Sequence, residues 1–347
     1  MTAGTVTVIG LDLAKNVFQL HGIDAEGRVL MRRQVRRHQL LKYFEQLPRC
    51  LVGMEACATA HYWGRELKRM GFEVKLMPPA YVRPYVKRGK NDAADAKAIC
   101  EAVTRPTMRF VPIKSSETQA LLMQHKTRDL LVRQRTALIN ALRGHLAEFG
   151  IVTAKGSMGV RAAIEALQSA KDELPVAAGQ AFEYIRKQLE EFDVKIAELD
   201  RIILKWCRTD AAARRLMTIP GVGPLTASAI SASVGNASEF KSPRQFSAWL
   251  GLTPRQNSSG GKEKMGGITK QGDRNIRRLL VVGATALLRR ARTDEAKFPW
   301  LAQLLQRKPA RLASVAVANK TARIAWAILR REEVYRSAAV RSNPTPA

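Results

Sequence analysis

The sequence predicts a mixed α/β region at the N-terminus, followed by an all-α region with a long helical connector. Three observations lead to this prediction. Short apolar runs rich in β-branched residues alternate with amphipathic stretches over the first 80 residues. From about residue 115 onward, apolar residues recur at helical spacing. Hydrophobic content of 46% and charged content of 25% over 347 residues are those of a globular chain long enough for two domains.

The N-terminal region predicts a sheet whose first three strands form a meander. The runs "VTVIGLDL", "NVFQLHGI" and "RVLMRRQVRR" are strand-like, with a turn at residues 24–27. They are followed by an amphipathic helix in "HQLLKYFEQL", a short buried strand in "CLVGME", a helix in "AHYWGRELKRMG" and a strand in "FEVKLMPP". This is the element order of a ribonuclease-H-like fold, and other mixed α/β folds share it.

A strict heptad pattern marks the middle of the chain. Steps of three and four residues separate its apolar positions, which are Phe182, Ile185, Leu189, Phe192, Ile196, Leu199, Ile203 and Trp206. So narrow a stripe favours a coiled coil and self-association over a long helix packed on its own domain. We expect four segments: an N-terminal domain 1–112, a helical connector 113–210, a C-terminal domain 211–335 and a disordered tail 336–347.

Positive charge dominates the composition, with 58 basic and 30 acidic residues and a net charge of +28. Residues 1–150 carry +12 and residues 241–347 carry +16, whereas residues 151–210 carry −1. Such a surface suits nucleic acid, because lysine and arginine release the counterions condensed on its phosphates. An anionic membrane surface is the alternative partner.

The sequence also indicates where the protein resides. It contains neither an apolar run of 18 residues nor a secretory signal, so we expect no membrane span and a cytoplasmic location. The cysteines have neither zinc-site nor disulfide spacing and are expected to be reduced; they are Cys50, Cys57, Cys100 and Cys207.

Four carboxylates of the N-terminal region suggest a metal site. Asp12 ends the first predicted strand and Glu55 ends "CLVGME", and buried strands seldom carry unpaired acids. Asp92 and Asp95 follow in "KNDAADAKAI", three residues apart and so on one helix face. Converging acids repel one another unless cations hold them, and such hard oxygen ligands suit Mg²⁺ or Mn²⁺ in phosphoryl transfer. Singly, Asp92 could cap a helix, Asp95 could be solvated and Glu55 could pair with an arginine.

The C-terminal region contains two candidate phosphate-binding motifs. "LMTIPGVGPLTASAI" resembles a helix-hairpin-helix, in which Gly221 and Gly223 would let backbone amides approach a phosphate, although a plain helix–helix turn fits too. Further on, the serine–glycine loop "NSSGGKEKMGG" directly precedes a basic helix. A serine there is open to a phosphodiester, although a flexible linker has the same composition. The predicted nucleic-acid contacts around this loop are Arg255, Lys270, Arg274, Arg277 and Arg278.

Together these motifs resemble the transposases of the insertion-sequence-110 family, in particular its insertion-sequence-1111 group. "GKNDAADAKAI" is similar to the third block of the family's DEDD quartet, and "GLTPRQNSSGG" is similar to its pattern GLxPRxxxSG. The resemblance extends from about residue 5 to about residue 290. It implies a RuvC-like N-terminal domain that binds Mg²⁺ or Mn²⁺ through Asp12, Glu55, Asp92 and Asp95.

The same resemblance implies that Ser259 is the nucleophile that attacks DNA, activated through the metal-binding acids because a free hydroxyl is a weak nucleophile. Chemistry alone leaves Ser258 open. The resemblance further implies donor and target DNA as partners and an element-encoded noncoding RNA that pairs with both. The heptad pattern predicts a dimer through the coiled coil, and we expect a tetramer in the active complex. The competing hypotheses are a metal-dependent junction-resolving nuclease that uses water and a non-catalytic nucleic-acid-binding scaffold. A covalent protein–DNA adduct distinguishes the first two.

Overall fold

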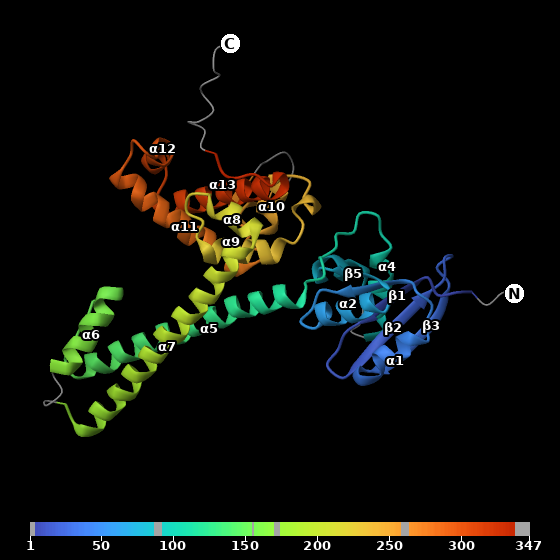
Figure 1. The fold of residues 1–347 in the computed structure, drawn as a ribbon, viewed down its shortest axis with the longest axis horizontal. Helices are drawn as coiled ribbons and strands as arrows, with labels where there is room; N and C mark the ends of the chain where they lie inside the picture. The colour runs from blue at the N-terminus through green and yellow to red at the C-terminus, as the bar shows by residue number, and fades with distance from the viewer. Residues whose placement is uncertain (1–3, 87–91, 155, 170–173, 258–263, 337–347) are drawn as a thin grey trace, which may run out of the picture. The chain divides into compact units, whose positions relative to one another are not determined.

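The computed structural model describes residues 4–86, 92–154, 156–169, 174–257 and 264–336 (Figure 1). The chain divides into two compact units, residues 1–118 and 119–347. The first unit is mixed α/β, and the second is helical with a β-hairpin. The predicted combination of an α/β region with a helical region is therefore confirmed, whereas the four segment boundaries stay predictions.

A five-stranded sheet in the order β3-β2-β1-β4-β5 forms the first unit. Strands β1 to β3 are the predicted antiparallel meander, and β4 and β5 run parallel to β1. The strands are β1 (Val8–Asp12), β2 (Val17–Ile23), β3 (Val29–Arg36), β4 (Leu51–Glu55) and β5 (Glu73–Met77). The helices are η1 (Arg37–Gln39), α1 (Leu40–Glu45), α2 (Ala60–Arg69), α3 (Pro79–Val82), η2 (Arg83–Tyr85) and α4 (Asp92–Val103). The element order predicted for residues 1–80 is confirmed, and the ribonuclease-H-like or RuvC-like assignment stays a prediction.

The two faces of this sheet differ because side chains alternate along each strand. One face packs with α1 and α2 in a core cluster that includes Ile9, Leu11, Val52 and Met54. On the other face, a Cβ at Gly10 would lie 2.1 Å from the carbonyl oxygen of Ala96 in α4. A Cβ at Gly53 would likewise lie 2.7 Å from the Cβ of Val103. Glycine at both strand positions therefore lets α4 lie directly on the sheet.

The second unit contains two long helices, several shorter ones and a β-hairpin. Helix α5 (Ser116–Glu148) begins at the end of the first unit and leads into the second. The other elements are α6 (Ser157–Ser169), α7 (Val176–Thr209), α8 (Ala211–Met217), α9 (Pro224–Val234), η3 (Ala237–Glu239), α10 (Pro243–Trp249), β6 (Pro254–Gln256), β7 (Met265–Ile268), α11 (Arg274–Thr293), α12 (Pro299–Arg307) and α13 (Ala310–Arg331). None of the helices in the described part of the chain is long and apolar enough to cross a membrane.

Residues of the predicted heptad pattern in α7 pack within the chain itself. Phe182 and Leu189 are buried in a cluster that also contains Ile139 and Leu142 of α5. Ile203, nearer the end of α7, is buried in the large core cluster formed with α8 to α13. These three positions of the pattern are therefore covered by the same chain.

Ion pairs join α5 and α7 between these two clusters. Arg128 pairs with Asp200 and Arg135 pairs with Asp193, each at 2.5 Å. The two arginines are seven residues apart on α5, and the two aspartates are seven residues apart on α7. Helix α5 therefore has the same heptad spacing as α7, and the two helices form a helical hairpin. Periodicity predicts which face of a helix is buried, but not which helix covers it. Self-association of the protein stays a prediction. Phe182, Leu189 and Ile203 are already buried within the same chain, so these three positions are not available to a second copy.

Candidate active site and nucleic-acid interface

Asp12 and Glu55 end two adjacent parallel strands. The register of β1 and β4 pairs Gly10 with Gly53, and the two acids follow two residues later on their respective strands. Continuing this register places Asp12 beside Glu55, at the roughly 4.8 Å spacing of neighbouring strands. Because side chains alternate, both acids share the face of the two glycines, which is the face that α4 covers.

Helix α4 brings a third acid to the same place. Asp95 immediately precedes Ala96, whose carbonyl group faces Gly10 of β1. Burial raises the pKa of Glu55, and the nearby carboxylates of Asp12 and Asp95 raise it further. The structure therefore brings Asp12, Glu55 and Asp95 together at the edge of the sheet where β1 and β4 end.

The fourth predicted ligand, Asp92, is the first residue of α4, and its side chain lies outside the described residues. Among the side chains that are described, no three of His, Cys, Asp and Glu lie close enough to hold an ion. The donor chemistry nevertheless fits a hard divalent cation, because the cluster offers carboxylate oxygens. A cation there would also relieve the repulsion that raises the pKa of Glu55.

Gln19 of β2 is a neighbour of this cluster that the sequence analysis missed. It pairs with Asp12 in the antiparallel register of β1 and β2 and is only 9% exposed. Directly paired residues share a face of the sheet, so its amide lies on the side that α4 covers. An amide can donate a hydrogen bond that orients a carboxylate. The available signal was a polar residue inside the apolar run "VFQLHGI".

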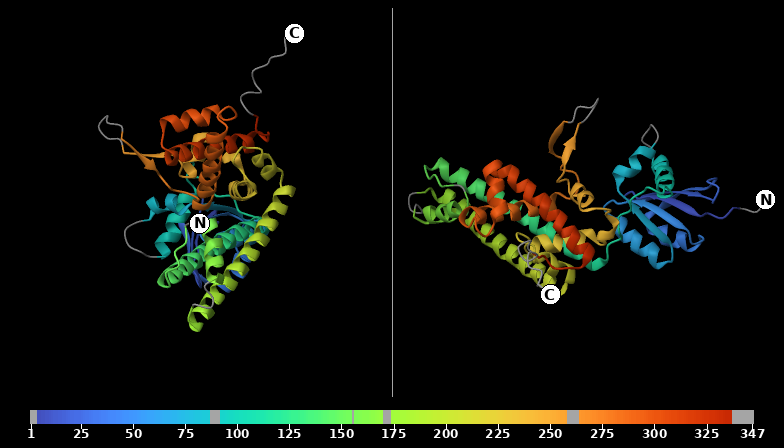
Figure 2. Two further views of the ribbon diagram at one scale, coloured as in Figure 1. Left: turned by 90° about the vertical axis from the view of Figure 1, so that its left-hand side faces the viewer. Right: turned by 90° about the horizontal axis from the view of Figure 1, so that it is seen from above.

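The serine loop connects the two strands of an exposed hairpin in the second unit. Strands β6 and β7 pair antiparallel, and the backbone N–H of Asn257 donates to the carbonyl oxygen of Lys264 at 2.9 Å. Figure 2 shows this hairpin projecting from the helices of its unit. Ser258 and Ser259 follow Asn257 and lie outside the described residues. The assignment of Ser259 as nucleophile therefore stays a prediction.

Glycines and an arginine hold the base of the hairpin. Gly251 and Gly272 have positive φ angles of 69° and 82°, and a Cβ on either would lie 2.0 or 1.8 Å from a backbone carbonyl oxygen of the opposing segment. The guanidinium of Arg277 donates to the carbonyl oxygens of Leu250 and Gln271, each at 3.0 Å. These two bonds fasten the hairpin to α11, and the predicted phosphate contact of Arg277 stays a prediction.

The other predicted phosphate-binding side chains differ in availability. Arg278 forms an ion pair with Asp129 of α5 at 2.5 Å. Lys270 and Arg274 are exposed and form no ion pair with any residue that the structure describes. Arg255 is exposed too, and its guanidinium donates a long hydrogen bond of 3.4 Å to the carbonyl oxygen of Thr269. Of the predicted side chains, Arg255, Lys270 and Arg274 are therefore the most open to a phosphate.

The turn between α8 and α9 gives its two glycines different surroundings. Gly221 has a φ of 81°, and a Cβ there would lie 2.6 Å from the side chain of Leu287 in α11. A Cβ on Gly283 of α11 would in turn lie 2.1 Å from the carbonyl oxygen of Gly221. Gly221 thus serves the packing of α11, and its predicted role at a phosphate stays a prediction. Gly223 precedes α9 with open space beside it, so the phosphate role stays a prediction for this residue.

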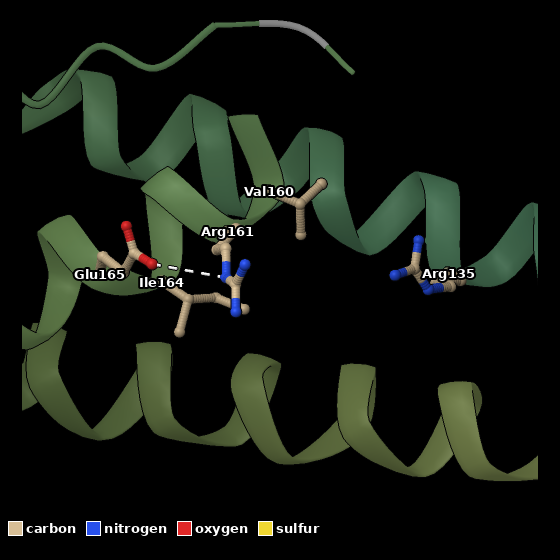
Figure 3. A pocket seen from close by; sticks show the side chains of 5 residues that line it. All are labelled: Arg135, Val160, Arg161, Ile164 and Glu165. Carbon is tan, nitrogen blue, oxygen red and sulfur yellow. Dashed lines mark ion pairs between the residues drawn. The ribbon is translucent and has the colours of Figure 1, made fainter. Parts of the chain in front are cut away.

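A separate cavity of about 390 Å³ lies between α5 and α6. It is lined by Arg135, Val160, Arg161, Ile164 and Glu165 (Figure 3). Arg161 and Glu165 pair with each other at 3.6 Å across one helical turn. None of the predicted site residues lines this cavity, so it forms no part of the candidate site.

Comparison with known proteins links both units to one family. Residues 213–299 match the model described as "Transposase IS116/IS110/IS902 family", and residues 9–151 match a model of the IS110 DEDD type described as "Transposase". Over 331 residues the chain is 49% identical to a probable family 20 transposase of Pseudomonas aeruginosa, covering 94% of this chain and 98% of that one. The chain belongs to the IS110/IS116/IS902 family of transposases.

Further relatives extend this assignment to named insertion sequences. The chain is 41% identical to the transposase for IS1111A of Coxiella burnetii, covering 96% of this chain and 92% of the relative. It is 38% identical to the transposase for IS1328 of Yersinia enterocolitica, covering 95% and 98%. The predicted family is confirmed, and a transposase has DNA as its partner. The two matched regions contain all four predicted acids of this transposase and its predicted serine.

Proposed function

We propose that this transposase cuts and rejoins DNA through a serine–phosphodiester intermediate. Ser259 is the proposed nucleophile, and the proposed ligands of Mg²⁺ or Mn²⁺ are Asp12, Glu55, Asp92 and Asp95. The position of Asp95 of α4 close to Glu55 and Asp12 at the ends of β4 and β1 is the observation that carries the proposal. Like charges gathered at the ends of buried strands oppose folding, and cation binding is the role that accounts for them best.

The proposed reaction exchanges one phosphodiester for another. The Ser259 hydroxyl gives up its proton as Oγ bonds to phosphorus, while the bond from phosphorus to one deoxyribose oxygen breaks and that oxygen takes a proton. A hydroxyl of the second DNA end then attacks the serine ester, which rejoins the strand and restores the serine. The exchange needs neither an oxidant nor a high-energy cofactor, because each ester formed replaces one that is broken.

Activation of the serine is the part of the reaction that the acids explain. A bound divalent cation supplies Lewis-acid stabilisation for the charge that develops on the phosphoryl group. The proposal requires the acids and Ser259 to act on one phosphate in the complex with DNA. Arg255, Lys270 and Arg274 would hold flanking phosphates, which positions the strand without reading its sequence.

We further propose that a noncoding RNA of the insertion sequence selects the DNA by base pairing. The net charge of +28 supports it, because it suits a protein that holds two kinds of nucleic acid by their backbones. When base pairing reads the sequence, the protein needs few contacts to base edges. The family resemblance noted in the sequence is the second support.

A metal-dependent nuclease that uses water is the second candidate function. The same acid cluster favours it, since two metal ions can transfer a phosphoryl group to water without a protein nucleophile. A purely structural nucleic-acid scaffold is disfavoured, because it gives no reason to gather acids on a strongly basic chain.

Matched serine variants test the proposal. End-labelled DNA that carries the junction of the insertion sequence is incubated with the protein, its RNA and Mg²⁺. Ser259→Ala should lose cleavage while retaining DNA binding, whereas Ser258→Ala should still cut. Asp12→Asn should also abolish cleavage and retain binding. Cutting by Ser259→Ala at the wild-type rate would contradict the serine mechanism and support the water-dependent nuclease.

A further inference from the structure

A second cavity, of about 700 Å³, lies within the first unit. Its lining comes from the loop between β1 and β2, the end of β3 with η1, and the first turn of α2. The lining residues are Asn16, Val17, Arg36, Arg37, His38, Tyr62 and Trp63. None of the described residues that line it is acidic, so its charge favours an anionic ligand.

Aromatic rings form a fixed wall of this cavity. Trp63 is 4% exposed and packs edge-to-face against Phe18 at 5.2 Å and against Tyr62 at 5.0 Å. The guanidinium of Arg37 lies 5.2 Å from the centre of the Trp63 ring, which holds it over the indole. Tyr62 keeps 44% of its surface exposed. A planar ligand could therefore stack on Tyr62 without displacing the core.

The indole nitrogen of Trp63 is an unsatisfied donor. Its Nε1 is buried and has no hydrogen-bond partner among the residues that the structure describes. Buried N–H groups without an acceptor are rare, because they lose their bonds to water and gain none in return. A ligand that offers an acceptor next to an aromatic ring would satisfy this group. Nucleobases combine a flat ring with acceptors on its edge.

The cavity lies at the end of the sheet where β1 and β4 end, because its lining includes the loop after β1 and the first turn of the helix that follows β4. Asn16 follows Asp12 by four residues, and Tyr62 follows Glu55 by seven. The backbone N–H of Arg37 donates to the carbonyl oxygen of Asn16 at 2.8 Å, which ties the basic end of β3 to the loop after Asp12. A nucleotide in this cavity would therefore be bound at the same end of the sheet as the acid cluster, on the side that α2 covers.

We propose that this cavity binds one unpaired nucleotide at the same end of the sheet as the acid cluster. The base stacks on Tyr62 and accepts a hydrogen bond from Trp63, while Arg36 and Arg37 hold its phosphates. Aromatic stacking combined with a basic rim is how proteins hold single-stranded nucleic acid. The proposal rests on the transposase function only for the choice of nucleic acid as ligand. The cavity proposal predicts that the enzyme binds an unstacked base at the same end of the sheet as the acid cluster.

Binding by the full-length protein tests the cavity. The probes are a fluorescent DNA hairpin with a single-stranded overhang, a fully paired duplex, and the overhang sequence as RNA. Tyr62→Ala should weaken binding of the overhang roughly 5- to 150-fold and leave duplex binding unchanged. Tyr81→Ala is the matched control, because Tyr81 of α3 has the same 44% exposure and does not line the cavity.

A second variant tests the unsatisfied donor. Trp63→Phe keeps an aromatic ring against Phe18 but removes the N–H group, so it should weaken overhang binding while the protein still melts cooperatively. A 5-iodouracil placed in the overhang should photocrosslink to the peptide that contains Tyr62. A loss confined to RNA assigns the nucleotide to RNA, and a loss on DNA assigns it to DNA.

Two results would overturn the cavity proposal. The first is unchanged overhang binding by both Tyr62→Ala and Trp63→Phe. The second is an equal loss on overhang and duplex, which would show general phosphate binding. Because the readout is binding without cleavage, either failure leaves the serine mechanism standing. Conversely, a failure of the serine mechanism leaves this binding result unchanged.

Discussion

Glu55 is an acid of the first unit whose pKa is raised both by burial and by neighbouring carboxylates. It is partly buried at the end of a strand, and the carboxylates of Asp12 and Asp95 lie close to it. This arrangement disfavours the charged form of Glu55 in the absence of a cation. This unfavourable electrostatic interaction is local, because it arises from three acids brought together by β1, β4 and α4.

Replacing Glu55 by glutamine should separate folding from metal binding. In EDTA, Glu55→Gln should melt at a higher temperature than wild type, because the buried charge and its repulsion are gone. Mn²⁺ should raise the melting temperature of wild type and have a smaller effect on the variant. Glu45→Gln, at an exposed site on α1, is the control and should behave like wild type. Differential scanning fluorimetry measures both effects.

The opposite pattern would remove the basis of the metal site. It consists of a Glu55→Gln protein that melts lower than wild type in EDTA, together with a wild-type protein that does not respond to Mn²⁺ or Mg²⁺. Glu55 would then serve the fold through a partner and not as a ligand.

The sequence indicated which acids could form a site, but it did not indicate the residues that surround them. Asp12 and Glu55 were recognisable because acids rarely end apolar strands. Gln19 and Trp63 were missed, because a buried polar residue or an aromatic in a helix fits an ordinary core equally well. Gly10 could be understood only from its contact with Ala96, which no sequence pattern reveals.

At the scale of elements, a buried hydrogen bond joins α5 to α9. His125 Nε2 lies 2.9 Å from Ser228 Oγ, and that hydroxyl donates its own proton to the carbonyl oxygen of Pro224 at 2.7 Å. Ser228 must therefore accept from His125, which carries its proton on Nε2. Burial lowers the pKa of His125 to about 4, and the positive charge of Arg128 adds to this effect.

This pair predicts acid sensitivity of the second unit. Between the ordinary histidine pKa of 6.5 and about 4, the unfolded chain binds a proton that the folded chain excludes, so stability falls as pH falls through that window. The loss reaches at most about 3 kcal/mol at the acid end. His125→Gln can still donate to Ser228 and should flatten the dependence, as measured by urea unfolding from pH 7 to 4.5. His145→Gln, exposed on the same helix, is the control. Equal slopes for wild type and His125→Gln would refute the assignment.

The helical hairpin of α5 and α7 makes a second prediction at this scale. Leu189 is 3% exposed and packs against α5, so Leu189→Ala should lower the free energy of unfolding by about 2–5 kcal/mol. Tyr184→Ala, at a position 74% exposed on the same helix, should have little effect. The Leu189 effect should be independent of protein concentration, because its partners belong to the same chain.

A concentration-dependent loss would instead show that Leu189 packs between chains, as the heptad spacing alone predicts. That spacing identified the buried face of α7 correctly at Phe182, Leu189 and Ile203. It could not identify α5 as the partner, because the matching acid and base positions lie far apart in sequence, 72 residues for Arg128 and Asp200. Antiparallel pairing within a chain and pairing between chains leave the same periodicity.

At the scale of the whole molecule, the chain separates its two sets of proposed catalytic groups. The acids belong to the first compact unit, and the serine loop belongs to the second. Each set lies in a region matched by a transposase family model. The family and the change from α/β to helical structure could be predicted from the sequence, because motifs and periodicity are local. The packing roles of Gly221 and Arg277 could not, because both depend on contacts with distant segments.

The strong positive charge is also a property of the whole chain, with a net charge of +28. Lys270 and Arg274 are exposed without ion-pair partners in the described part of the chain, whereas Arg278 is paired with Asp129. Nucleic-acid affinity should therefore depend on the first two residues more than on Arg278. Positive charge explains why the protein should bind nucleic acid, but it does not explain how the protein would cut a strand.

Capture of a covalent protein–DNA adduct tests the central claim most directly. Labelled junction DNA is incubated with the full-length protein, its RNA and Mg²⁺, and denaturing electrophoresis with mass spectrometry locates any label on the protein. Wild type should carry label on the peptide that contains Ser259, while Ser259→Ala and Asp12→Asn should carry none and still bind DNA. Cleaved DNA without label on the wild-type protein, or label that persists in Ser259→Ala, would contradict the account.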